Sequence, residues 1–234
     1  MGVQATRNLS KKLVRFIKRN VMPQQSHYWE YYGRVRFASD LILNSDLPDY
    51  KVLDLGGATG NNLLKKFGVK NVMTLDLKEG ADIVASASDV PVEDGAFEFV
   101  TSLDMLEHVP QGLRLKVVEE LVRICKKKII LIAPVKSDEN IWAEQFVLQH
   151  RPDDFLKEHL EQGLVDFDQI EKQVKAFQSD GRVKSYRRYE LDNLQTWVSL
   201  MTEDFCNSSE VYQACYEKLE NRFVPRRLAL IIEK

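Results

Sequence analysis

The stretch KVLDLGGATGNNLLKKFG, residues 51–68, decides the fold. An apolar run ends at Leu55, a helical pattern begins near Asn62, and three glycines lie between them, at positions 56, 57 and 60. A sharp turn from a strand into a helix favours glycine, because glycine adopts backbone conformations that are closed to other residues. Such turns frequently serve a ligand that approaches the backbone closely. The stretch therefore predicts a ligand site directly after the first strand.

Apolar runs and helical patterns continue to alternate after this turn. Strands are expected over residues 51–57, 71–78, 81–86, 96–103 and 128–135, and helices over 61–68 and 112–128. This alternation predicts an α/β fold with a doubly wound, mostly parallel sheet that is covered by helices on both faces. Sheets of this kind bind ligands beyond the carboxyl ends of their strands. We therefore expect the ligand-binding and catalytic residues to lie where each apolar run ends.

The chain divides into four predicted parts, which are an N-terminal helical cap, the α/β core, a charged helical insertion on the acceptor side, and a C-terminal strand at or near a sheet edge: residues 1–46, 47–137, 138–222 and 223–234. The amphipathic pattern of residues 8–20 fits a helix packed on the domain or one lying on an anionic membrane surface, and its short length favours packing. Within the insertion, RVKSYRRY, residues 182–189, is a candidate sixth strand.

Composition limits the partners and the compartment. The formal net charge is -2, from 33 basic and 35 acidic side chains, so no global field attracts nucleic acid and no such partner is expected. Three cysteines without a CxxC pair favour a reducing compartment, and cytoplasm is the prediction. No apolar run approaches the roughly 20 residues of a membrane helix, and no signal peptide is recognisable, so stable membrane insertion is not expected.

Two nucleotide-binding patterns compete for the glycine turn. A nicotinamide dehydrogenase needs G-x-G-x-x-G, which the order of glycines here does not fit, and Asp54 would repel a pyrophosphate. The pattern that fits is D-x-G-x-x-x-G, with Asp54, Gly56 and Gly60. In this motif the chain resembles the class I S-adenosylmethionine-dependent methyltransferases.

Two later segments carry the same resemblance. Asp76 ends the run VMTLD, and ASDVPVEDGAFEFVTSLDMLEHVP, residues 87–110, is similar to the family's run of a turn, a strand and an LEHV segment. The three segments occur in the family's order over about residues 50–135. The resemblance implies a Rossmann-like methyltransferase fold and S-adenosylmethionine as the methyl donor.

The resemblance also implies a set of donor-binding residues. Asp54 would hold the methionine end, Asp76 the ribose hydroxyls, and Leu77 would lie against adenine. Ser86 stands where many family members carry an aspartate, and Asp89 is a candidate to replace it. The full predicted set is Asp54, Gly56, Gly57, Ala58, Gly60, Asp76, Leu77, Ser86, Ala87, Ser102 and Leu103.

His108 is the candidate catalytic base, because an unprotonated imidazole is available near neutral pH. The alternative is that it only caps a helix or fixes a loop. If DMLEH were helical, Asp104, Glu107 and His108 would share one face and could hold Mg²⁺. The resembling metal pattern has glutamate at the first position, so no metal is included in the predicted site.

The insertion is expected to bind the methyl acceptor. Trp142, His150 and His159 are candidates to line its pocket, and His159 beside Glu158 is an alternative base. The segment is similar to inserts of methyltransferases in bacterial glycan synthesis, which favours a sugar hydroxyl or another small polar molecule as acceptor. A methyltransferase fold that serves as a binding or regulatory module without turnover is the competing hypothesis. The oligomeric state is left open.

Overall fold

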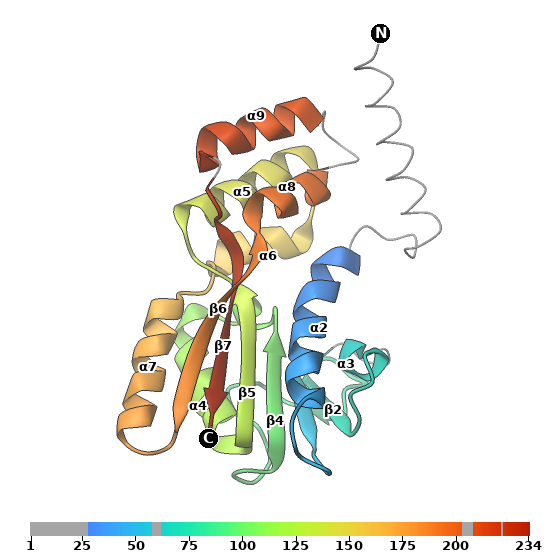
Figure 1. Ribbon diagram of the computed structural model, residues 1–234, viewed down its shortest axis with the longest axis vertical. Coiled ribbons are helices and arrows are strands. Elements are labelled where there is room, and N and C mark those ends of the chain that lie inside the picture. The colour runs from blue at the N-terminus through green and yellow to red at the C-terminus, as the bar shows by residue number, and fades with distance from the viewer. Residues whose placement is uncertain (1–27, 58–61, 203–207, 221) are drawn as a thin grey trace. The chain divides into compact units, whose positions relative to one another are not determined.

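The structure, a computed structural model, describes residues 28–57, 62–202, 208–220 and 222–234 (Figure 1). The helices are α2 (Tyr28–Leu43), α3 (Leu63–Lys66), α4 (Gln111–Ile124), α5 (Asp138–His150), α6 (Asp154–Gln162), α7 (Phe167–Ser179), α8 (Leu194–Thr202) and α9 (Ser208–Leu219), with the 3-10 turn η1 (Leu106–His108). The strands are β1 (Val52–Leu55), β2 (Val72–Asp76), β3 (Ile83–Val84), β4 (Phe97–Leu103), β5 (Cys125–Pro134), β6 (Ser185–Asn193) and β7 (Pro225–Glu233). The helix predicted over residues 8–20 lies outside the described residues.

Seven strands form one sheet in the order β3-β2-β1-β4-β5-β7-β6. The first five are parallel to their neighbours, whereas β7 runs antiparallel to both β5 and β6. This confirms the predicted doubly wound, mostly parallel sheet. The C-terminal strand lies one place from the edge, and the candidate sixth strand forms the edge as β6, beginning three residues later than the pattern suggested.

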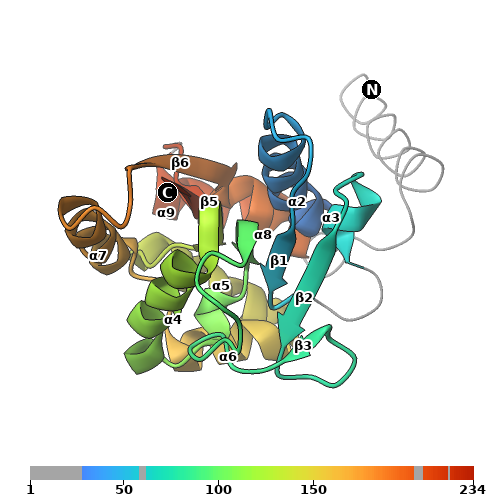
Figure 2. The same ribbon diagram turned by 90° about the horizontal axis from the view of Figure 1, so that it is seen from below.

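Helices cover both faces of this sheet. The core on one face joins α4 and α7 to the strands, and the core on the other joins α3 and the described part of α2 from Val35 onward. Figure 2 shows α4 on one face, with α2 and α3 on the other. Strand interiors such as Val52–Leu55 are buried on both sides, as expected of parallel strands between two helical layers.

The boundary between the predicted helix of residues 112–128 and the strand that follows it differs from the prediction. The helix expected over residues 112–128 ends at Ile124, and Cys125 already has the extended backbone of β5. Cys125 pairs with Phe97 at the start of β4, so sheet pairing overrides the helical propensity of the three lysines that follow.

The predicted insertion, residues 138–222, serves two parts of the fold. Its middle contributes α7 and β6 to the α/β core, while α5, α6, α8 and α9 build a third apolar core that includes Val147, Leu156, Trp197 and Cys215. Figure 1 shows these four helices beyond the carboxyl ends of β4 and β5. No helix among the described residues is long and apolar enough to span a membrane.

Candidate active site

The glycines that follow β1 are required by the chain's own packing. Gly56 has φ +73°, and a Cβ there would overlap the Met105 side chain. A Cβ on Gly57 would lie 2.7 Å from Asp54 Oδ2. The next part of the turn, with the predicted Ala58 and Gly60, lies outside the described residues. Close approach of a ligand to this backbone therefore stays a prediction.

Asp54 of β1 accepts hydrogen bonds from β4 and from the residue that caps α3. Its Oδ1 accepts a hydrogen bond of 2.6 Å from the Thr101 hydroxyl of β4, and its Oδ2 accepts one of 2.7 Å from Asn62 Nδ2. Asn62 in turn caps α3 by accepting from the Leu64 and Lys65 amides. Burial raises the pKa of Asp54 to about 6, although both hydrogen bonds oppose that shift. Asp54 thus fixes both ends of the glycine turn.

The carboxyl end of β2 presents a carboxylate beside an exposed apolar side chain. Asp76 accepts a hydrogen bond of 3.1 Å from the Lys78 amide and is partly exposed. Leu77 is 75% exposed, which is unusual for a leucine next to a buried strand. Ionised carboxylate oxygens accept hydrogen bonds from hydroxyls, and an exposed leucine offers a surface for a flat ring. The pair therefore fits a nucleoside.

The remaining predicted donor residues follow β3 and end β4. Ser86 and Ala87 are half-buried, and the Ser86 carbonyl accepts from the Asp89 amide in a turn. Ser102 is fully buried and its hydroxyl has no hydrogen-bond partner among the described residues. An unsatisfied buried hydroxyl at the end of β4 is compatible with a polar ligand group or a water there. Leu103, beside it, packs against the core under α2 and α3.

Asp104 does not belong to a metal site. It has φ +51° and precedes η1, which includes only residues 106–108, so no helical face joins it to Glu107 and His108. Its carboxylate binds Arg227 at 2.6–2.9 Å and Arg34 at 3.2 Å. Burial alone would raise the pKa of Asp104, but these two guanidinium groups lower it to about 2. The hypothetical Asp104, Glu107 and His108 site is therefore not formed.

His108 instead meets His159 from the helical insertion. Their Nε2 atoms lie 3.3 Å apart. His108 Nδ1 lies 2.9 Å from Glu158 Oε2, and His159 Nδ1 lies 3.1 Å from Glu144 Oε1. Burial and the neighbouring His159 lower the pKa of His108, so its ring is neutral at neutral pH. Each imidazole is thus oriented by a carboxylate.

The sequences of α5 and α6 explain why Glu144 and His159 face inward. Asp153 caps the start of α6, Gly163 with φ +76° ends it, and Leu156 and His159 share its buried face three residues apart. On α5, Asn140 and Glu144 are buried one turn apart. The sequence therefore directs His159 and Glu144 inward from two helices.

A fully buried arginine supports the cluster. Arg226 of β7 donates to Glu144 Oε1 at 2.7 Å and to Asn140 Oδ1 at 3.2 Å, and its guanidinium lies 4.1 Å from the Trp197 ring centroid. Burial alone would raise the pKa of Glu144, but Arg226 and His159 lower it. Because strand side chains alternate, the adjacent Arg227 points instead to Asp104.

Glu107 completes this group. Its carboxylate is fully buried, and neither oxygen accepts a hydrogen bond from a residue that the structure describes. Its Oε1 lies 4.0 Å from His159 Nε2. Burial, together with the charge of Asp104, raises the pKa of Glu107 well above its usual range.

The other predicted acceptor residues stay apart from the cluster. His150 is exposed, and its Nδ1 lies 2.7 Å from the Phe146 carbonyl of its own helix. Trp142 is half-buried beside Phe146.

Sequence reasoning singled out His108, Glu158 and His159 but missed Glu144 and Arg226. A paired arginine at the start of an apolar strand was the available signal, because alternation must turn one of the two inward.

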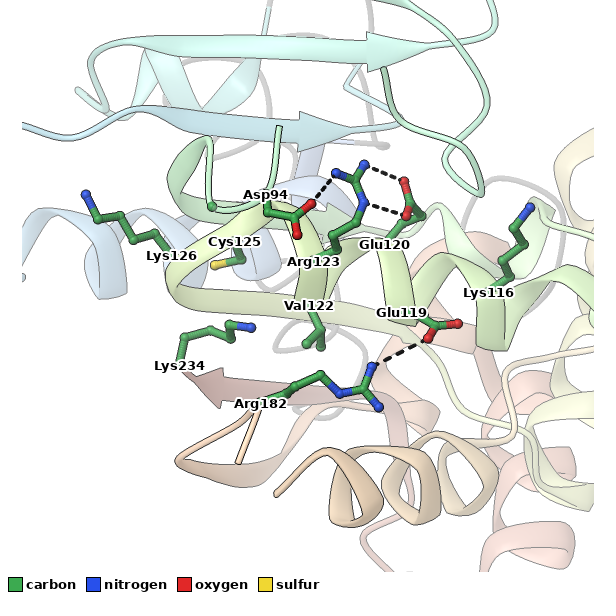
Figure 3. A pocket seen from close by; sticks show the side chains of 11 residues that line it. Asp94, Lys116, Glu119, Glu120, Val122, Arg123, Cys125, Lys126, Arg182 and Lys234 are labelled. Carbon is green, nitrogen blue, oxygen red and sulfur yellow. Dashed lines mark hydrogen bonds and ion pairs between the residues drawn. The ribbon is translucent and has the colours of Figure 1, made fainter. Parts of the chain in front are cut away.

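A separate hollow of about 660 Å³ opens near the amino ends of β4 and β5. The glycine turn follows the carboxyl end of β1, so the two lie at opposite ends of the parallel strands. Figure 3 shows its charged lining, in which Arg123 binds Asp94 and Glu120, and Arg182 binds Glu119. None of the described residues predicted for the donor site lines it. Several of the charges there pair with one another, and the hollow lies at the opposite ends of the strands from the predicted donor residues.

Solved structures share the fold. A SAM dependent methyltransferase from Archaeoglobus fulgidus is 16% identical, with a TM-score of 0.58 over 95% of this chain and 99% of that one. The plantazolicin methyltransferase BpumL, in complex with SAH, is 10% identical, with a TM-score of 0.56 over 100% and 91%. The YcgJ protein from Bacillus subtilis is 12% identical, with a TM-score of 0.52 over 86% and 97%. The fold is thus the Rossmann-like methyltransferase fold.

The sequence comparison adds a family match over part of the chain. Residues 53–133, from β1 to β5, match the model described as a methyltransferase domain. The match spans the glycine turn, Asp76 and the segment that ends in His108. No curated protein matches the chain. Both comparisons thus show similarity to methyltransferases, in one domain over part of the chain and in the fold.

Proposed function

We propose that the protein is an S-adenosylmethionine-dependent methyltransferase that methylates a hydroxyl of a small polar acceptor, with a sugar as the first choice. One observation supports this most directly. The carboxyl ends of β1, β2 and β4 bring together a glycine turn, the Asp76 carboxylate and the exposed Leu77, within the segment that matches the methyltransferase domain.

The chain's own residues fit the donor. Asp76 would accept hydrogen bonds from the two ribose hydroxyls, and Leu77 would cover the adenine. Ala87 would offer its backbone N–H to the ring, and Ser102 and Leu103 would border the methyl group. Asp54, which shapes the turn, would reach the methionine end directly or through water, beside Gly56, Gly57, Ala58 and Gly60.

The donor supplies a methyl group that its sulfonium already activates, so the protein must align the acceptor and remove a proton. The acceptor oxygen forms the new bond to the methyl carbon as the carbon–sulfur bond breaks, and S-adenosylhomocysteine leaves. His108 is the proposed proton acceptor, since Glu158 fixes its Nδ1 and its neutral ring has a lone pair on Nε2. The helical insertion that carries His159 would enclose the acceptor.

The compartment and partners follow the same proposal. Cys125 and Cys215 are free and buried, which is compatible with a reducing environment, and we place the protein in the cytoplasm. A small-molecule or glycan acceptor needs no nucleic-acid partner.

Calorimetric titration with S-adenosylmethionine and S-adenosylhomocysteine tests the donor assignment. We expect both to bind at micromolar concentration, and a panel of sugars and phenols with labelled donor would then identify the acceptor. His108→Ala should slow turnover more than it weakens donor binding, and an unchanged rate would remove its catalytic role. Absence of binding by both ligands would leave a methyltransferase fold used as a regulatory module.

A further inference from the structure

The imidazoles of His108 and His159 face each other in an arrangement that calls for a cation. Each Nδ1 lies next to a carboxylate oxygen, at 2.9 Å from Glu158 and 3.1 Å from Glu144. A carboxylate oxygen beside Nδ1 favours the tautomer that carries its proton there, and in that tautomer the lone pair of each ring is on Nε2. The two Nε2 atoms are 3.3 Å apart, and two lone pairs at that distance repel unless a cation lies between them.

Glu107 provides a second, independent indication. Its side chain is fully buried beside the two rings, and neither oxygen accepts a hydrogen bond from the described residues. The nearby Arg114 does not satisfy it, since that guanidinium donates to backbone carbonyls, including that of Glu107. A buried carboxyl group without a partner is costly, and a metal ion would satisfy it.

We propose that Glu107, His108 and His159 bind a divalent first-row transition metal ion, with Zn²⁺ as the reference case. Zinc–nitrogen bonds of about 2.0–2.1 Å at a tetrahedral angle place two nitrogen ligands about 3.4 Å apart, close to the separation of the rings. The three ligand atoms lie within 4.8 Å of one another, so Glu107 would move inward by roughly 1 Å. Two imidazoles favour such an ion over Mg²⁺.

The surroundings complete the arrangement. Metal-binding histidines usually donate their other ring N–H to a carboxylate, which fixes the tautomer and strengthens the ligand. Glu158 and Glu144 occupy these positions, and Arg226 holds Glu144 at 2.7 Å. The cluster therefore contains carboxylates that would orient the two histidines, as well as the proposed metal ligands themselves.

The site lies close to the glycine turn. Met105, two residues before Glu107, packs directly against Gly56. Three protein ligands leave a position open for water or a substrate oxygen. If the proposed methyl transfer holds, that position would take the acceptor hydroxyl and lower its pKa, and His108 would then assist as a ligand rather than as the base.

Metal binding can be measured without any activity assay. The full chain, purified without a histidine tag and stripped with a chelator, is titrated with Co²⁺ while the visible absorption is followed, and its Zn²⁺ content is measured after gel filtration. We expect one ion per chain with the spectrum of histidine-bound cobalt. Glu107→Gln and His159→Ala should each weaken binding by more than about 100-fold, and Glu158→Gln by about 10- to 100-fold.

The matched control is His150→Gln, because His150 lies on α5 outside the cluster, where its Nδ1 faces the Phe146 carbonyl of its own helix. It should bind metal as the unaltered chain does. Glu107→Gln keeps the shape of the side chain and removes no hydrogen bond, so it stays informative if His159→Ala fails to fold. Absence of a bound ion in the unaltered chain, or equal affinity in Glu107→Gln, would overturn the site and leave a proton shared by the two rings.

The metal site and the proposed function can fail separately. Donor titration in chelator tests the methyltransferase assignment, and metal titration without donor tests the cluster. If an acceptor is known, turnover that disappears with chelator and returns with Zn²⁺ or Co²⁺ would support the ligand role of His108. Turnover that persists in chelator would overturn the metal's role in acceptor activation and return His108 to the role of base.

Discussion

Two regions of the molecule differ in how far their charged residues are buried. The donor side carries the predicted donor residues, and the helical side is the cluster around His108 and His159, where the helical insertion packs on η1. On the donor side, Asp76 is partly exposed and Leu77 projects into solvent, whereas on the helical side Glu107, Glu144 and Arg226 are fully buried. The donor groups all come from one stretch, residues 52–103, while the buried cluster joins η1, α5, α6 and β7. Asp76 and Leu77 on the first side can therefore be changed at little cost in folding, whereas the removal of Arg226 on the second side would leave a buried partner without its ion pair.

The largest effect is expected for Arg226→Met. The substitution leaves Glu144 buried without its arginine partner, and breaking a buried pair in this way costs about 3–5 kcal/mol. Chemical denaturation should show this loss in the free energy of unfolding. The exposed Arg222→Met is the matched control and should change stability by less than about 1 kcal/mol. Equal effects in the two variants would contradict the contrast.

Asp54→Asn should produce the next largest effect, and one that depends on pH. The folded pKa of about 6 exceeds the ordinary value of 3.8, so the folded chain holds more protons between those values and this group's contribution to stability falls as pH rises through them. The total is about 3 kcal/mol. Asparagine removes the slope and can donate to the Thr101 hydroxyl, which can turn toward the Leu53 carbonyl.

Urea denaturation from pH 4 to pH 8 measures this difference. The variant should match the unaltered chain near pH 4 and exceed its stability above about pH 6. Asp94→Asn, which changes an exposed carboxylate, should keep the slope of the unaltered chain. An Asp54→Asn variant with that same slope would mean that Asp54 is ionised in the folded protein throughout this range.

The positions of Asp54 and Asp76 near the ends of two neighbouring strands could be predicted from sequence, because each depends on a local pattern. Asp76 ends a short apolar run and Asp54 lies one residue before the end of another, and the order of such runs predicts which strand ends share an edge. The end of the predicted helix was wrong because it depends on a contact between residues distant in sequence. The helix pattern of residues 112–128 could not show that Cys125 joins the sheet, because that depends on pairing with Phe97, far away in the chain.

The helical side could not be assembled from sequence. His108, Glu158 and His159 were individually suspect, but His108 and His159 are 51 residues apart, and Glu144 and Arg226 are 82 apart. No periodicity reports how α5 and α6 pack on η1. A glutamate within a charged helix also predicts solvent exposure, so the burial of Glu144 becomes visible only with Arg226 beside it.

Asp76→Ala is expected to weaken donor binding by about 30-fold, equivalent to about 2 kcal/mol for lost charge-assisted hydrogen bonds. Because Asp76 is partly exposed, the free energy of unfolding without ligand should stay unchanged. Calorimetry with S-adenosylhomocysteine measures the first quantity and chemical denaturation the second. The matched control is Glu79→Ala, an exposed acidic residue three positions later. Tight binding by Asp76→Ala would refute the ribose assignment.

Leu77→Ala should give the smallest effect, a loss of about fivefold in affinity for S-adenosylhomocysteine, because it removes about 1 kcal/mol of apolar contact with a flat ring. The substitution should leave stability unchanged, since this side chain is 75% exposed without ligand. Leu43→Ala, at the end of α2, removes another exposed leucine and should not alter affinity. If both variants bind the donor product equally well, Leu77 is an ordinary surface leucine, and the adenine must lie against other residues of this edge.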